Sequence, residues 1–142
     1  MTRTVAIVGL SPDPQRPSHI VAAYLRGHGY RIIPVNPTVA EVHGERSYPN
    51  LRVVPEPVDI VVIFRRPEHV PGIVDAAIAI GARAVWMQEG VRHEQAAARA
   101  RNAGLIVVMG RCIKKERERL RRAGRLSLNP LPQHTGRPRE DF

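Results

Sequence analysis

Cysteine is almost absent from this 142-residue sequence. The single residue, Cys112, excludes an internal disulfide and any zinc or iron–sulfur site built from several cysteines. Long apolar runs are absent as well, since none approaches the roughly 18 residues that a membrane-spanning helix needs. The sequence begins a strand pattern without a charged-then-apolar leader. With 43% hydrophobic residues, we expect one cytoplasmic globular domain that makes no membrane contact.

A complete dinucleotide fingerprint is also missing. Gly9 ends the first apolar run, but Ser11 stands where the second glycine would let a pyrophosphate approach the backbone, and the third glycine is lacking. After the second apolar run the sequence has Asn36 and Pro37, not the acidic residue that holds the ribose of NAD. An NAD(P)-binding oxidoreductase module therefore stands only as an alternative.

Acidic residues are scarce in one segment only. The net charge is +9, and residues 1–110 have 12 basic and 9 acidic side chains, whereas residues 111–125 have 8 and 2. Glu116 and Glu118 can pair with neighbouring arginines, and no aromatic residue is interleaved with the cations. Nucleic-acid binding through this basic segment is thus a disfavoured alternative to a solvated helix face.

The apolar runs that are present alternate with helical patterns. Short β-branched runs predict strands at residues 4–10, 31–35, 59–64, 83–87 and 105–109, and amphipathic spacing predicts helices at 18–28, 67–80 and 92–103. The first helix has an N-cap-like Ser18, and residues 38–58 form the least regular stretch. This alternation predicts an α/β fold: a Rossmann-like, doubly wound parallel sheet of about five strands, which we expect in the order 3-2-1-4-5. From residue 113 a charged helix leads into a Pro/Gly/Asn-rich tail that we expect to pack poorly.

Cationic residues gather where the predicted strands end. Ligands of open α/β sheets bind at the carboxyl ends of the strands. Arg16 precedes the first helix, whose N-terminus favours anions, and Arg65 and Arg66 follow the third strand. Three arginines at one rim favour a phosphorylated ligand over solvated loop cations.

Five motifs in order on these strand ends resemble a known family. They are SPDPQRPS (11–18), PVNP (34–37), VDIVVIFRRP (58–67), VWMQEGV (85–91) and VVMGRCI (107–113). The set is similar to the CoA-binding domain family, small stand-alone bacterial proteins related to the N-terminal domain of the succinyl-CoA synthetase α subunit. The resemblance covers about residues 4–115 and implies coenzyme A as the cofactor. From the resemblance together with the charge pattern, we expect a CoA-binding domain at 1–115 and a basic helix with a flexible tail at 116–142.

The resemblance implies a ligand site along the whole rim. The residues that it implies are Gly9, Ser11, Arg16 and Ser18 for the phosphates, Asn36 and Pro37 for the adenosine, Phe64, Arg65, Arg66 and Val70 along the nucleotide and pantetheine, and Gln88, Glu89, Gly90, Met109, Cys112 and Ile113 at the far end. The sequence departs from the family in having Gly110, not an acidic residue, before the Arg-Cys pair.

No catalytic pair or metal ligand set is predicted. The six histidines show no metal or triad spacing, and a solvated Glu89 is favoured over a general base. We therefore expect a non-catalytic protein that binds CoA or an acyl-CoA, for which a homodimer or association with an acyl-CoA enzyme is left open. Cys112 is either a buried structural thiol or a partner for the CoA thiol in a mixed disulfide.

Overall fold

The chain forms a parallel β-sheet with helices on both faces, and the computed structural model describes residues 3–124. Five strands lie in the order β2-β1-β5-β6-β7. Their bounds are β1 (Thr4–Val8), β2 (Arg31–Val35), β5 (Ile60–Ile63), β6 (Ala84–Met87) and β7 (Ile106–Met109). All neighbouring pairs of this sheet are parallel. The predicted Rossmann-like class is confirmed.

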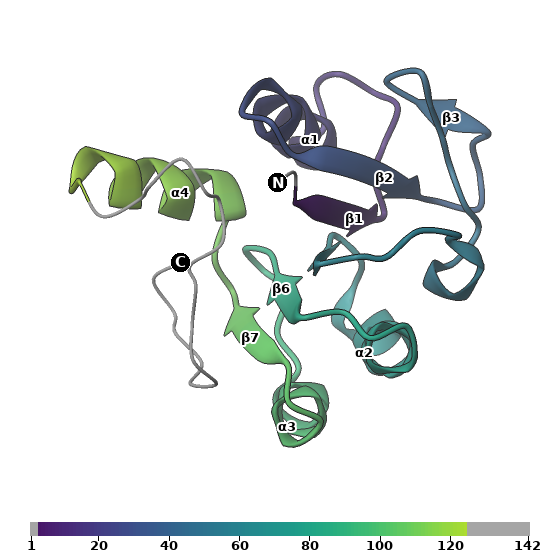
Figure 1. Cartoon of the computed structure of the whole chain (residues 1–142), viewed down its shortest axis with the longest axis vertical. Coiled ribbons are helices and arrows are strands. Elements are labelled where there is room, and N and C mark those ends of the chain that lie inside the picture. Colours follow the sequence, from purple (N-terminus) through teal and green to yellow (C-terminus); the bar gives the residue numbers. More distant parts are fainter. Residues whose placement is uncertain (1–2, 125–142) are drawn as a thin grey trace.

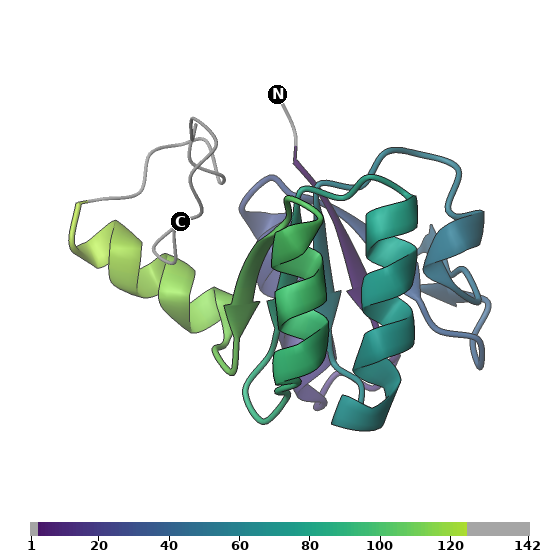
Figure 2. The same ribbon diagram turned by 90° about the horizontal axis from the view of Figure 1, so that it is seen from below.

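Four α-helices cover the sheet within the described residues. They are α1 (Pro17–Gly27), α2 (Val70–Ala79), α3 (Glu94–Asn102) and α4 (Ile113–Arg122). Helices α1 and α4 lie on one face, and α2 and α3 lie side by side on the other (Figures 1 and 2). The first three are each followed by a left-handed glycine, Gly29, Gly81 or Gly104, with φ of +91°, +77° and +91°. Glycine ends a helix in this conformation because it has no Cβ to clash.

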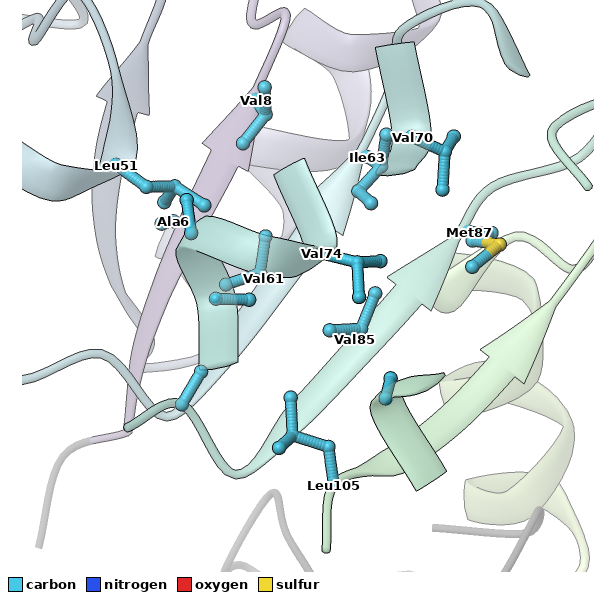
Figure 3. Packing of buried hydrophobic residues seen from close by; sticks show 14 of the residues in the cluster. Ala6, Val8, Leu51, Val61, Ile63, Val70, Val74, Val85, Met87 and Leu105 are labelled. Carbon is cyan, nitrogen blue, oxygen red and sulfur yellow. The ribbon is translucent and has the colours of Figure 1, made fainter. Parts of the chain in front are cut away.

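The core consists of two apolar layers, one on each face of the sheet. Alternate residues of each strand point to opposite faces, so Ala6, Val61 and Val85 pack under α2 and α3 (Figure 3). Val5 and Val62 pack against α1 on the other side. Both layers are closed to solvent, which explains why the strands are apolar without alternation.

The predicted strand order is wrong. The expected order 3-2-1-4-5 placed the third predicted strand outside β2, whereas that strand, β5, lies between β1 and β6. The outer side of β2 is instead lined by Tyr48, whose N–H donates to Pro34 O at 3.1 Å and whose carbonyl accepts from Asn36 N at 2.8 Å. Pro34 has no N–H to donate, so β2 suits the edge of the sheet and not its interior.

The irregular segment between β2 and β5 is better ordered than the sequence pattern indicates. It contains a hairpin of β3 (Glu41–Val42) and β4 (Glu45–Arg46), followed by the 3₁₀ helix η1 (Leu51–Val53). The hairpin turn uses His43 and Gly44 with φ of +56° and +75°, as a tight two-residue turn requires. The sequence pattern indicates only an irregular stretch over residues 38–58, so it does not predict the hairpin or η1.

Helix α4 crosses the predicted boundary at 115/116. Leu120 and Arg117 are buried, and Tyr24 of α1 donates to Glu118 and accepts from Arg117. Ile113 belongs to the core layer under α1. The division at this boundary stays a prediction, and the tail expected at 126–142 lies outside the described residues.

Candidate functional site

The strand order reverses between β1 and β5. The helix that follows β1 packs on one face of the sheet and the helix that follows β5 packs on the other, which leaves a crevice beyond the carboxyl ends of these two strands. Gly9 follows β1 at this point, and Phe64 and Arg65 follow β5. Phe64 N donates to Val8 O at 2.9 Å, so the two strand ends remain paired up to the crevice.

The backbone conformation where β1 ends beside β5 requires a glycine at residue 9. Its φ is +90°, and its N–H donates to Val35 O at 2.9 Å. A Cβ on residue 9 would lie 3.1 Å from both Phe64 O and Arg65 Cδ. The absence of a side chain therefore allows the two strand ends to approach closely. It also leaves the surface between them without a protruding side chain.

The loop after β1 is held by its own side chains. Ser11 N donates to Ser18 Oγ at 3.0 Å, and Ser11 Oγ accepts from Asp13 N at 3.1 Å. Ser18 is buried inside the first turn of α1, and the N-cap residue is Arg16. The expectation that Ser18 caps the helix is wrong, because Pro17 begins the helix one residue earlier and turns Ser18 back toward Ser11.

The N-terminus of α1 offers an anion fewer donors than the sequence pattern predicts. Pro17 has no N–H, and the amides of His19 and Ile20 both donate to Arg16 O, at 3.0 and 3.1 Å. His19 Nδ1 lies 3.0 Å from Ser11 O. A phosphate at this loop would thus depend more on side-chain cations than on free helix amides.

The three arginines of the rim differ in exposure. Arg65 is half-buried at the end of β5, whereas Arg16 and Arg66 are exposed at the N-caps of α1 and of the 3₁₀ helix η2 (Pro67–His69). None of the three forms an ion pair within residues 3–124. Each therefore retains its charge for a ligand.

One cavity lies on the α2 face of the crevice. This η1–α2 cavity has a volume of about 360 Å³ and is lined by Val8, Val35, Pro37, Pro49, Asn50, Leu51, Arg52, Arg65, His69, Gly72, Ile73 and Ala76. Most of these residues, including Asn50 and Arg52, were missed by the sequence analysis. The available signal was the Pro-Asn turn before Leu51, where Asn50 Oδ1 accepts from Arg52 N at 2.9 Å.

A second cavity lies on the α1 face. This Cys112 cavity has a volume of about 250 Å³ and is lined by Pro17, Val21, Phe64, Gln88, Glu89, Val91 and Cys112. Phe64 and Arg65 are consecutive at the end of β5, so their side chains leave on opposite faces of the sheet. Arg65 lines the η1–α2 cavity and Phe64 lines the Cys112 cavity. Gly9 lies against the Phe64 carbonyl and the Arg65 side chain.

Asn36 connects the ends of β1 and β2. Its Nδ2 donates to Leu10 O at 2.9 Å, and its Oδ1 accepts from both the N–H and the Oγ1 of Thr38, at 2.9 and 2.7 Å. The side chain is therefore engaged in holding the loop. Of the predicted pair, Pro37 is the residue that lines a cavity.

Gln88 and Glu89 connect β6 to α4. Gln88 Oε1 accepts from Ile113 N at 3.0 Å, where it caps the first turn of α4. Glu89 accepts from Lys115 Nζ at 3.1 Å on the surface. These contacts place the start of α4, with Cys112 as its N-cap residue, against the end of β6.

Three of the predicted site residues lie elsewhere. Val70 and Ile113 are buried in the two core layers. Met109 lines a separate polar cavity beside the edge strand β7, together with Arg92, Arg101 and Arg111. Val70 and Ile113 can influence a ligand only through packing.

Both carboxylates of α4 are paired with arginines, and a histidine of the hairpin is desolvated. Glu116 pairs with Arg111 and Arg119, and hydrogen bonds from Arg121 and Tyr24 lower the pKa of Glu118 to about 2. At the hairpin, burial first and then the nearby His19 lower the pKa of His43. The two rings lie 4.0 Å apart between centroids, so we expect His43 to be neutral at pH 7.

Within residues 3–124 there is neither a candidate metal site nor a helix that could span a membrane. The acidic, histidine and cysteine side chains of this part of the chain do not gather in groups of three or more that would suit a metal ion. Among its helices, none combines the length and apolar character that crossing a bilayer requires.

Comparison with known proteins gives a family match over most of the chain. A family model described as a CoA binding domain matches residues 3–118. The Bacillus subtilis protein YneT is 39% identical over 113 residues, which cover 80% of this chain and 84% of YneT. The solved structure of a hypothetical protein from Pyrococcus horikoshii OT3 superposes with a TM-score of 0.81 at 40% identity, covering 84% of each chain.

A third relative is a much larger enzyme. An ADP-forming acetate–CoA ligase from Archaeoglobus fulgidus is 30% identical over 73 residues, which are 51% of this chain and 11% of the ligase. The matched region is therefore a small part of that protein.

Proposed function

This chain belongs to the CoA-binding domain family, and from that premise we propose that it binds coenzyme A or an acyl-CoA across the carboxyl ends of β1, β5 and β6. The observation that carries the proposal is the pair of cavities on opposite faces of the sheet, lined by Arg65 and by Phe64, with Gly9 packed against these two residues. CoA has the matching form, a phosphorylated adenosine joined to a long neutral arm that ends in a thiol.

The adenosine end of the ligand fits the η1–α2 cavity. Its apolar floor of Val8, Val35 and Ile73 can take a flat ring, and Arg52 and Arg65 supply positive charge beside it. Asn50 and His69 add polar groups for orientation, as small-molecule sites commonly use. Arginine suits the 3′-phosphate of CoA because its guanidinium can make two parallel hydrogen bonds to one phosphoryl group.

The pyrophosphate lies in this arrangement over the loop after β1. Gly9 keeps that surface free of a side chain, and Ser11 lies next to it. Arg16 and Arg66 are exposed at the N-caps of α1 and η2. Their unpaired charges compensate for the few free amides at the N-terminus of α1.

The pantetheine arm fits the Cys112 cavity. Phe64, Val21 and Val91 give it apolar walls, and Gln88 and Glu89 give it polar groups. A neutral chain with two amides requires such a mixture, whereas a second charged nucleotide, as in NAD(P), would place phosphate or ribose among apolar side chains. The CoA ligase from Archaeoglobus fulgidus supports the same ligand class.

We propose binding without catalysis. Glu89, the carboxylate beside the Cys112 cavity, forms a surface ion pair with Lys115. A general base needs a carboxylate in an environment that raises its pKa, usually by burial. Glu89 is exposed and engaged by Lys115, so the cavity offers no buried carboxylate for this role.

A ligand comparison tests the proposal. Thermal shift and calorimetry with CoA, acetyl-CoA, NAD, NADP and ATP should show the largest stabilisation and the tightest binding for the two CoA species. Dephospho-CoA should bind more weakly than CoA. Stabilisation by NADP without any by CoA would overturn the proposal and favour the oxidoreductase alternative.

A further inference from the structure

We propose that His19 and His43 position the loop after β1, so that the hairpin of β3 and β4 sets how tightly this loop holds a phosphorylated ligand. The proposal rests on the proposed function and adds two positioning residues to it. Neither histidine lines the η1–α2 cavity or the Cys112 cavity. Their effect on a ligand therefore passes through the backbone of the loop.

The backbone of Ser11 is held at its N–H and at its carbonyl by two consecutive residues of α1. Ser11 N donates to Ser18 Oγ at 3.0 Å, and Ser11 O lies 3.0 Å from His19 Nδ1. Because a carbonyl oxygen can only accept, this contact places a proton on Nδ1 of His19. The preceding carbonyl, Leu10 O, accepts from Asn36 Nδ2 at 2.9 Å. Each carbonyl thus has a donor that offsets its partial negative charge, which would otherwise repel a phosphate beside this loop.

His43 contacts the ring of His19 from the turn of the hairpin. The two ring centroids are 4.0 Å apart, and the ring planes are inclined by 44°. Val42 attaches the hairpin next to this contact, because it is buried in the core layer under α1. Packing against a second ring limits the rotamers that His19 can adopt, so its Nδ1 stays directed at Ser11 O.

The strain at His43 is the second, independent indication that its ring has a use. Within residues 3–124, His43 is the single non-glycine residue with a positive φ, +56°, at a turn position where asparagine or glycine is usual. Its Nε2 is buried and has no hydrogen-bond partner in the same part of the chain, which is destabilising. Asparagine would form the turn without either penalty, but it could not make the ring contact with His19. Unfavourable features of this kind persist mainly near functional sites.

The substitution His43→Asn separates positioning from folding. Asparagine suits the turn, so thermal unfolding should show a stability equal to or higher than that of the wild type. The loss of the ring contact should nevertheless weaken CoA about threefold in calorimetry. The matched control is His28→Asn, the same substitution at the opposite end of α1, where His28 lies against Tyr24. It should leave CoA affinity unchanged, and an equal loss of affinity in this control would overturn the proposal.

Two substitutions of His19 test the hydrogen bond to the loop. His19→Phe keeps a ring and removes the donor, so CoA affinity should fall about tenfold. His19→Asn keeps an amide donor near the position of Nδ1, so the loss should be only about threefold, as in His43→Asn. Dephospho-CoA, which keeps the pyrophosphate, should show the same losses, whereas pantetheine should show none. Equal losses of CoA affinity in the two His19 variants would refute the role of the donor and with it the proposal.

The wild-type chain distinguishes the failure of this proposal from the failure of the proposed function. If the wild type binds CoA and the variants His43→Asn and His19→Phe bind it equally well, the positioning role is refuted and CoA binding stands. If the wild type binds no CoA, the proposed function has failed and the positioning role fails with it.

Discussion

The two cavities at the carboxyl ends of the strands differ in chemistry and in the way their walls are held. The η1–α2 cavity contains Arg52 and Arg65 above an apolar floor, whereas the walls of the Cys112 cavity are mainly apolar, around Gln88 and Cys112. The difference suits the two ends of one asymmetric ligand. A charged head would bind at the first cavity, and a neutral arm that ends in a thiol would lie in the second.

The walls are attached to the sheet by different contacts. The segment beside the η1–α2 cavity is held by the backbone hydrogen bonds of Tyr48 to β2 and, in addition, by surface ion pairs, in which Arg31 contacts Glu45 at 2.8 Å and Glu56 at 3.0 Å. The wall of the Cys112 cavity is held by a buried hydrogen bond from Ile113 N to Gln88 Oε1 and by the packing of Leu120 and Arg117. We therefore expect the first wall to depend more on pH and salt than the second.

The largest effect should follow from adding a side chain to Gly9, where the end of β1 contacts the end of β5. Gly9→Ala places a Cβ 3.1 Å from Phe64 O at a φ of +90°, so we expect a loss of about 2–3 kcal/mol in stability and of about tenfold or more in CoA affinity. Thermal unfolding and calorimetry measure the two.

Gly29→Ala is the matched control for that substitution. Gly29 has a φ of +91°, but a Cβ there meets nothing within 4 Å. It should lose about 1–2 kcal/mol from backbone strain and leave CoA affinity unchanged. Equal losses of CoA affinity in the two variants would mean that Gly9 is not part of the proposed CoA site.

The second effect should separate the charged cavity from the neutral one. Arg65→Ala removes the half-buried cation of the η1–α2 cavity, and the loss of a charge-assisted hydrogen bond to phosphate should weaken CoA about 10–100-fold. Pantetheine, which has no nucleotide, should be unaffected in competition binding. The control is Arg83→Ala, which removes an exposed arginine next to the opposite end of β6. If Arg65→Ala weakened pantetheine as much as CoA, the assignment of the ligand ends to the cavities would be reversed.

The sequence predicted the strands and the rim better than the cavities between them. Strand and helix positions follow from local periodicity and from glycines such as Gly81 and Gly104, and these predictions are confirmed within a few residues. The strand order depends on which edge of β2 is free. Pro34, which has no N–H, indicates that β2 is an edge strand. The predicted order 3-2-1-4-5 did not use this single residue and placed β2 inside the sheet.

The wall of the η1–α2 cavity could not be predicted from local pattern. Asn50 and Arg52 reach β1 and β2 only because the segment between β2 and β5 crosses over the sheet edge, and a sequence pattern does not contain that long-range placement. Local pattern also does not show which way a side chain points. Val70 and Ile113 match the family motifs, but both are buried in the core. Motif position identifies the strand end, whereas side-chain direction depends on packing.

A smaller effect should show which phosphate is nearest to the loop after β1. Arg16 is exposed, so Arg16→Ala should weaken CoA by only about threefold to tenfold. If Arg16 contacts the 3′-phosphate, dephospho-CoA should lose almost nothing. Calorimetry with both ligands makes the comparison. Equal losses would place Arg16 at the pyrophosphate.

The smallest effect concerns the ion pairs behind the η1–α2 cavity. Hydrogen bonding by Arg31 lowers the pKa of Glu56 below its usual range. A carboxylate with a lowered folded-state pKa stabilises the protein above its unfolded-state pKa, and the contribution is lost as pH falls through the folded-state value. Glu56→Gln should therefore cost about 0.5 kcal/mol at pH 7 and less as the pH falls below about 4. Urea unfolding at several pH values measures the difference. Glu89→Gln, which breaks the exposed pair with Lys115 beside the other cavity, is the control. If this control loses as much stability as Glu56→Gln, the two walls do not differ in their dependence on charge.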